Sequence, residues 1–210
     1  MPNIPKHVVL RMIIATLATL TATTVALAQD QIYAPCLNTS GDTAAIDAGF
    51  IAAGWTPLTD PAARTAALWT LGEASYVVRL VPPTPASAAA LSSDMAAARA
   101  DAADRFRGQT VFHRDTTVAL YYFPFSPDLS ALNCMFSGPS LPEAAAILDS
   151  GAEVKTNADL TFLTSRLTNP TVDITDITVD VTRYTPSFPI DPPITGLESM
   201  FVRVKAAAAP

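Results

Sequence analysis

The spacing of hydrophobic positions changes along the chain: it is typical of helices in the first half and of strands in the second. Asp42 is a good N-cap for a helix that ends at Gly54. Asp60 is expected to cap a second helix, which has Pro61 at its first position. The faces that these helices are expected to bury carry Ile46, Phe50 and Ala53 in the first, and Leu68, Leu71, Ser75 and Val78 in the second.

A third helix is predicted over 86–107, after a break that the prolines of 81–85 impose. Its expected buried face carries Leu91, Met95, Ala98, Ala102 and Phe106. The opposite face is charged and is predicted to lie in solvent, Arg99 included.

Beyond Gly108 the pattern favours strands. Strands are predicted at 110–113, 117–123, 131–136, 171–183 and 200–204, and 55–58 is read as a short extended segment. The first two of these strands are joined by a tight turn at 114–116, and 171–183 changes parity near Thr175-Asp176, which predicts a β-bulge there. A capping box at 140–143 predicts a short helix that ends before Gly151, whereas 152–156 and 159–167 stay ambiguous.

Helices that precede strands in this way indicate an α+β fold rather than repeated βαβ units. We expect N-terminal helices packed on a mainly antiparallel sheet built from the C-terminal half. Residues 29–210 are predicted to form a single domain with a frayed tail from Ala206 onward.

The first 28 residues have the three parts of a cleavable signal peptide. Lys6 and Arg11 form a positive n-region, and 12–27 is apolar. Ala26 and Ala28 supply the small residues that signal peptidase requires, so cleavage is predicted after Ala28. No second long apolar run follows, so no stable membrane insertion is expected after cleavage. The sequence therefore predicts a periplasmic or secreted protein.

The mature chain is acidic. Lys6 and Arg11 are two of the 13 Lys and Arg residues, and the predicted signal holds none of the 19 Asp and Glu residues. Cleavage leaves 11 basic against 19 acidic residues. This balance argues against nucleic acid and against an anionic membrane surface as partners, because both attract clustered positive charge.

Cys36 and Cys134 are the only two cysteines. In an exported domain they predict one disulfide bond, with two buried free thiols as the alternative. The bond would close a loop of roughly 100 residues, and the chain-entropy model gives such a loop about 4–5 kcal/mol of stabilisation.

No catalytic, metal-binding or cofactor-binding constellation stands out in the sequence. His113 is the only histidine beyond the predicted signal, which excludes a metal site built on several histidines. A small hydrolase that uses His113 with Asp115 or Cys134 is one alternative, motivated only by closeness in sequence. Asp173, Asp176 and Asp180 lack the spacing of a calcium loop and are read as solvent-facing acids, and no cofactor is expected.

The aromatic residues are a second candidate feature. Four of them are concentrated at Tyr121, Tyr122, Phe123 and Phe125. Adjacent strand residues point to opposite faces, so some of these rings either pack under a helix or line an exposed groove. The leading hypothesis is a non-catalytic binding or accessory protein of the cell envelope or the extracellular space, whose partner is a protein or a small ligand.

Overall fold

The structure is a computed structural model. It describes residues 32–79, 84–124, 131–150, 154–167 and 174–206. Contacts divide the chain into two units, Met1–Ala34 and Pro35–Pro210. Every helix and strand described below lies in the second unit, except that the first of them begins at Ala34.

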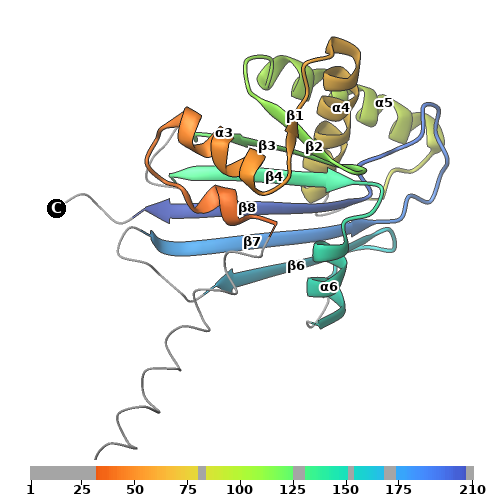
Figure 1. Ribbon diagram of the computed structural model, residues 1–210. Coiled ribbons are helices and arrows are strands. Elements are labelled where there is room, and N and C mark those ends of the chain that lie inside the picture. The colour runs from red at the N-terminus through yellow and green to blue at the C-terminus, as the bar shows by residue number, and fades with distance from the viewer. Residues whose placement is uncertain (1–31, 80–83, 125–130, 151–153, 168–173, 207–210) are drawn as a thin grey trace, which may run out of the picture. The chain divides into compact units, whose positions relative to one another are not determined.

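The helices gather mainly in the first half of the chain and the longer strands in the second (Figure 1). The helices are η1 (Ala34–Leu37, a 3-10 helix), α3 (Thr43–Ala52), α4 (Pro61–Val78), α5 (Ala88–Arg105) and α6 (Pro142–Ser150). The strands are β1 (Thr56–Pro57), β2 (Val111–Arg114), β3 (Thr117–Tyr122), β4 (Leu132–Gly138), β5 (Val154–Lys155), β6 (Leu160–Leu167), β7 (Ile174–Tyr184) and β8 (Glu198–Ala206). The predicted α+β class is confirmed, and both ambiguous segments contain a strand.

The sheet consists of two antiparallel meanders that meet edge to edge. Its strand order is β1-β2-β3-β4-β8-β7-β6-β5, and every neighbouring pair is antiparallel. The first meander contains β1 to β4 and the second contains β5 to β8. They join where β4 pairs with β8, with Cys134 opposite Val202. The last strand thus lies in the middle of the sheet and connects the two halves of the chain.

Alternation along the strands divides the first meander into two packed faces. Val111, Leu120 and Met135 lie in register on one face, where they join the hydrophobic cluster with residues of α4 and α5. Phe112 and Phe136 lie on the other face, with α3 over them (Figure 1). Helices therefore cover this part of the sheet on both sides.

Most predicted boundaries are confirmed within one or two residues. Asp42 and Asp60 cap α3 and α4 as expected, and their carboxylates accept hydrogen bonds from first-turn N–H groups. The bulge in β7 falls between Ile174 and Asp176. Ala53, which was expected on a buried helix face, is exposed instead because α3 ends at Ala52.

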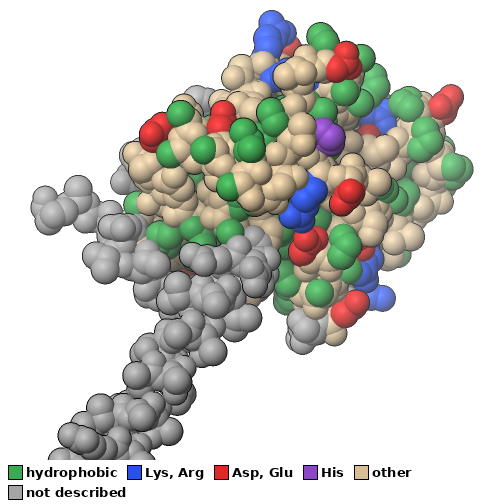
Figure 2. Space-filling model, viewed as in Figure 1, with side chains coloured by type: hydrophobic (Ala, Val, Ile, Leu, Met, Phe, Trp, Pro, Cys, Tyr) green, Lys and Arg blue, Asp and Glu red, His purple; other side chains and the backbone are tan. Residues whose placement is uncertain are grey.

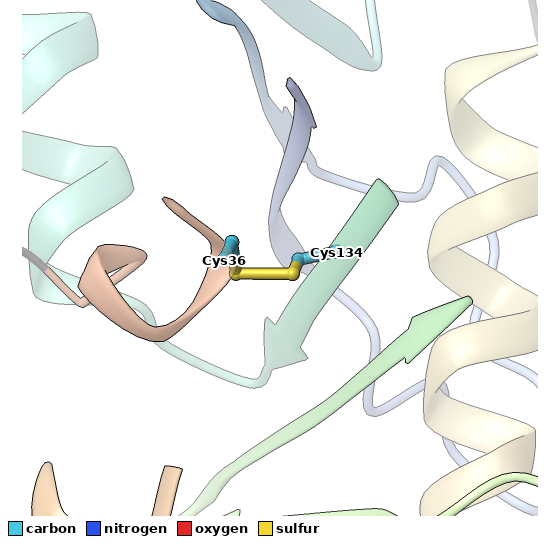
Figure 3. Close-up of a disulfide and its surroundings, with 2 residues drawn as sticks. All are labelled: Cys36 and Cys134. Atoms are coloured by element: carbon cyan, nitrogen blue, oxygen red, sulfur yellow. A yellow bond between two sulfur atoms is a disulfide. The ribbon is translucent and has the colours of Figure 1, made fainter. Parts of the chain in front are cut away.

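The predicted disulfide is confirmed (Figure 3). Cys36 lies in η1 and Cys134 in β4, with their Cα atoms 6.2 Å apart. Neither cysteine is more than 1% exposed. The bond ties the segment before α3 to the middle of the sheet.

Several sequence predictions lie outside the described residues. They are the signal peptide with its cleavage after Ala28, part of the break at 81–85, the tail beyond Ala206, and the residues Phe125 and Asp173. Ala206, where the frayed tail was expected to begin, is instead the last residue of β8. Among the residues that are described, no helix is both long and apolar enough to cross a membrane.

Candidate functional site

A groove of about 490 Å³ opens beside α4, where the helix meets β2, β3 and the loop between β7 and β8. Its lining is mostly apolar and includes Leu58, Ala63, Ala66, Trp69, Val118 and Pro193. A volume of this size suits a small molecule or a few side chains of a partner.

Trp69 gives this groove an exposed aromatic side chain. It is 40% exposed, and only two other large hydrophobic residues among those described, Ile51 and Phe123, are as open to solvent. Trp69 follows Leu68 directly, and Leu68 is 2% exposed because it faces the core. The helical period therefore turns the ring of Trp69 away from the core and toward the groove.

A buried carboxylate, that of Glu73, is part of the lining of the groove. Glu73 is 1% exposed and accepts a hydrogen bond from Arg99 Nε at 2.7 Å. Its other oxygen accepts from the backbone N–H groups of Thr195 and Gly196, both at 2.7 Å. Both carboxylate oxygens of Glu73 are therefore bonded within the protein, which is what a buried charge requires.

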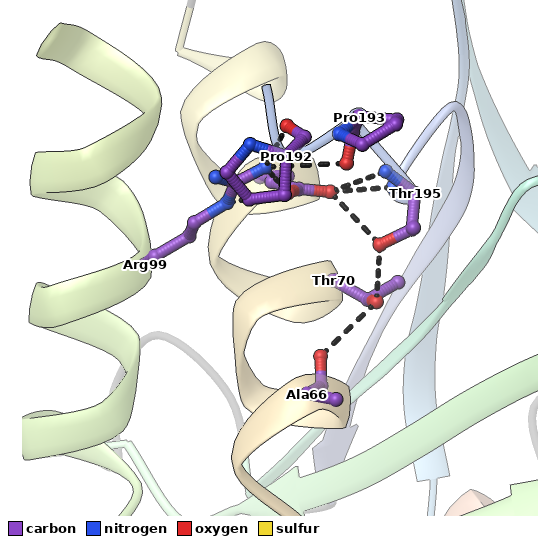
Figure 4. A network of polar contacts seen from close by, with 8 residues as sticks. Ala66, Thr70, Arg99, Pro192, Pro193 and Thr195 are labelled. Carbon is purple, nitrogen blue, oxygen red and sulfur yellow. Dashed lines mark hydrogen bonds and ion pairs between the residues drawn. The ribbon is translucent and has the colours of Figure 1, made fainter. Parts of the chain in front are cut away.

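Arg99 extends this network to the opposite wall. Its Nη2 donates to the carbonyl oxygens of Pro192 at 3.1 Å and Pro193 at 3.3 Å. The hydroxyls of Thr70 and Thr195 are 2.6 Å apart (Figure 4). Two helices and the 192–196 loop are thereby held together, and this rigidity gives the groove a preformed shape.

The burial of Arg99 corrects the sequence prediction. Arg99 was expected in solvent with the other charged residues of its helix, but it is 8% exposed. It points toward α4 because Glu73 lies there as a buried partner, 26 residues away in sequence. Glu73 lies off the helix face that the spacing of Leu68, Leu71, Ser75 and Val78 predicts to be buried, so no signal in the sequence indicated this pair.

His113 lines the same groove, across from the helix. Within the described part of the chain, no hydrogen bond or ion pair joins it to Asp115, which lies in the β2–β3 turn with a φ of 53°. Cys134 is held in the disulfide and its alternating position places it on the other face of the sheet. No observation therefore favours His113 with either residue as a catalytic pair.

The aromatic run is divided between the two faces, as alternation predicts. Tyr121 is 3% exposed under α3, and its hydroxyl donates to Asp47 Oδ1 at 2.7 Å. Tyr122 packs against Phe106 on the opposite face. Of the described residues of this run, only Phe123 is open to solvent, and Tyr121 and Tyr122 pack under helices instead of lining a groove.

Asp180 of β7 is bonded to other side chains. Asp180 accepts hydrogen bonds from Thr164 at 2.7 Å and from Arg203 at 2.6 Å, and it is 7% exposed. Asp180 is thus buried and paired, whereas the sequence predicted a solvent-facing acid. In the described ranges no three His, Cys, Asp or Glu residues are grouped as metal ligands.

A smaller hollow of about 250 Å³ lies along the outer junction of α4 and α5. There Tyr76 Oη donates to Asp94 Oδ2 at 2.6 Å. Burial, followed by this hydrogen bond, raises the pKa of Tyr76. The hydroxyl therefore stays protonated at physiological pH and serves as a hydrogen-bond donor between the helices.

Charges of both signs are dispersed over the face shown in Figure 2, where no block of basic side chains is seen among the described residues. Comparison of the chain with protein-family models, with curated proteins and with solved structures found no match. The site is therefore interpreted from its own geometry.

Proposed function

We propose that this chain is an exported, non-catalytic binding protein whose groove beside Trp69 receives an apolar ligand or an apolar segment of a partner. One observation carries the proposal: the groove is open and apolar, and the polar groups of Glu73, Thr70 and Thr195 beneath it are bonded to one another. Such a site resembles ligand pockets in general, which are mostly apolar with few polar groups.

The disulfide supports the export part of the proposal. Disulfide bonds persist in oxidising compartments, and the bond between Cys36 and Cys134 fits the signal peptide that the sequence predicts. The periplasm and the extracellular space are the two locations that this proposal covers. Intact-mass measurement of the exported protein should give a chain that begins at Gln29. A full-length mass would contradict cleavage after Ala28.

The groove is tested with a neutral apolar fluorophore, N-phenyl-1-naphthylamine, whose emission rises when it leaves water. Ala66 is exposed on α4 and lines the groove, so Ala66→Phe should fill the groove without disturbing the core. Ala96 is exposed on α5 and lines neither hollow described above, so Ala96→Phe is the matched control.

We expect the fluorophore to bind the native protein and the Ala96→Phe variant equally well, and the Ala66→Phe variant at least about tenfold more weakly. Equal binding by the native protein and both variants would place the fluorophore elsewhere and contradict the proposal. Turnover on a hydrolase substrate panel that His113→Ala abolishes would instead favour the hydrolase alternative.

A further inference from the structure

The guanidinium of Arg99 is only partly used by the protein. Its Nε donates to Glu73, and its Nη2 donates to Pro192 and Pro193. Nη1 makes no hydrogen bond to any residue in the described ranges.

Arg99 is among the residues that line the groove, and Nη1 carries those of its N–H groups that are not bonded within the described residues. An arginine is always charged and has five N–H donors and no acceptor. The ring of Trp69 lies 5.8 Å from the guanidinium carbon, which places this donor beside the apolar wall. The cationic end and the aromatic wall of the groove are thus adjacent.

The acceptors near Arg99 are occupied. Glu73 is the ion-pair partner of Arg99, and both of its oxygens are bonded: one to Arg99 and the other to the backbone N–H groups of Thr195 and Gly196. The carbonyl oxygens of Pro192 and Pro193 accept from Nη2. A ligand group that fits here must therefore accept hydrogen bonds, and a negative charge strengthens that contact.

We infer that the groove binds a small apolar molecule that ends in a carboxylate, with its body against Trp69 and its carboxylate at Arg99 Nη1. This inference rests on the proposed function and specifies its ligand class. A groove of about 490 Å³ is large enough for a small free acid. Its apolar lining removes the body of such a molecule from water.

The test is displacement of bound N-phenyl-1-naphthylamine by octanoate and by 1-octanol, which share one tail length. We expect octanoate to displace the fluorophore at a concentration at least about tenfold lower than 1-octanol, because only octanoate carries a negative charge that can pair with the guanidinium. Ala66→Phe should abolish octanoate binding measured by calorimetry, whereas Ala96→Phe should not.

Arg99→Gln should bring the two displacement concentrations together, because it removes the positive charge together with the Nη1 donor, while 1-octanol still displaces the fluorophore. If this variant fails to fold, two other results test the inference. They are the ratio of the octanoate and 1-octanol concentrations that displace the fluorophore from the native protein, and the loss of octanoate binding in Ala66→Phe. The same displacement is measured with an Ala-Ala-Leu tripeptide. If the tripeptide displaces the fluorophore at a lower concentration than octanoate does, the ligand is the C-terminus of a peptide, and the inference of a small free acid is overturned.

Equal displacement by octanoate and 1-octanol would overturn the carboxylate inference and leave the apolar groove standing. If the fluorophore itself fails to bind, the proposed function fails as well. Octanoate that binds Ala66→Phe as tightly as the native protein would also overturn the inference, because its site would lie outside the groove.

Discussion

Glu73 and Arg99 form a buried ion pair across the α4–α5 junction, with side chains 1% and 9% exposed and Arg99 Nε 2.7 Å from Glu73 Oε1. Removing two charges from water is costly, and their mutual attraction offsets this cost only when the remaining polar atoms are also bonded. Here Thr195 and Gly196 complete the bonding of the carboxylate. The pair therefore fixes the 192–196 loop in one position, and this loop forms a wall of the groove.

Glu73→Gln should destabilise the protein by about 3–5 kcal/mol, because it leaves the Arg99 charge buried and uncompensated. Urea unfolding measures the effect. Arg105→Ala is the control: the Arg105–Asp101 pair is 42% and 53% exposed, so its loss should cost no more than about 1 kcal/mol. Equal losses in both variants would show that burial does not matter at Glu73.

The sequence predicts most of the elements but not the groove. Caps, turn residues and hydrophobic spacing are local features of the sequence. Short windows of sequence were therefore enough to predict the N-caps Asp42 and Asp60 and the β-bulge in β7. The pairing of β4 with β8 joins segments far apart in the chain and has no local signal. Arg99 looks like an ordinary surface charge, and only the fold brings it to Glu73.

His113 illustrates the same limit. Its neighbour in sequence, Asp115, suggested a catalytic pair, whereas its neighbours in the groove are Trp69, Val118 and residues of the 192–195 loop. This shared lining depends on the placement of α4 over the sheet. Closeness in sequence was therefore a poor guide to which residues share a site.

Gly72→Ala should loosen the junction of α4 and α5. A Cβ at position 72 would lie 2.5 Å from the carbonyl oxygen of Ala98 and 2.8 Å from Cβ of Ala102, so the helices must separate. We expect a loss of about 1–3 kcal/mol in the free energy of unfolding, despite the better helix propensity of alanine.

Gly108→Ala is the matched control for this variant, because a Cβ there meets nothing within 4 Å. Its free energy of unfolding should stay within about 0.5 kcal/mol of the native value. If Gly72→Ala is as stable as Gly108→Ala, the two helices do not pack as closely as the structure shows.

Cys36→Ser and Cys134→Ser should lower the melting temperature by similar amounts, since either change removes the same bond. The expected loss is about 2–5 kcal/mol, because 98 residues separate the cysteines and the unfolded chain regains the freedom of that loop. Thermal unfolding of the native protein with and without a reducing agent is the control. Two reactive thiols per unreduced, unfolded chain would show that no bond exists.

The last prediction concerns alkaline pH. Burial, followed by the nearby carboxylate of Asp159, raises the pKa of Tyr184 to about 12. The unfolded chain has an ordinary tyrosine pKa of about 10, so the folded state holds this proton more tightly above that pH. Its stabilising contribution is complete below pH of about 10 and is lost as the pH rises toward 12, at a total of roughly 2 kcal/mol.

Tyr184 Oη is buried with no hydrogen-bond partner among the described residues. Tyr184→Phe should therefore leave stability at pH 7 unchanged or slightly higher, while the free energy of unfolding declines less steeply between pH 10 and 12 than in the native protein. Urea unfolding at a series of pH values measures both effects, and identical slopes for the two proteins would contradict the raised pKa.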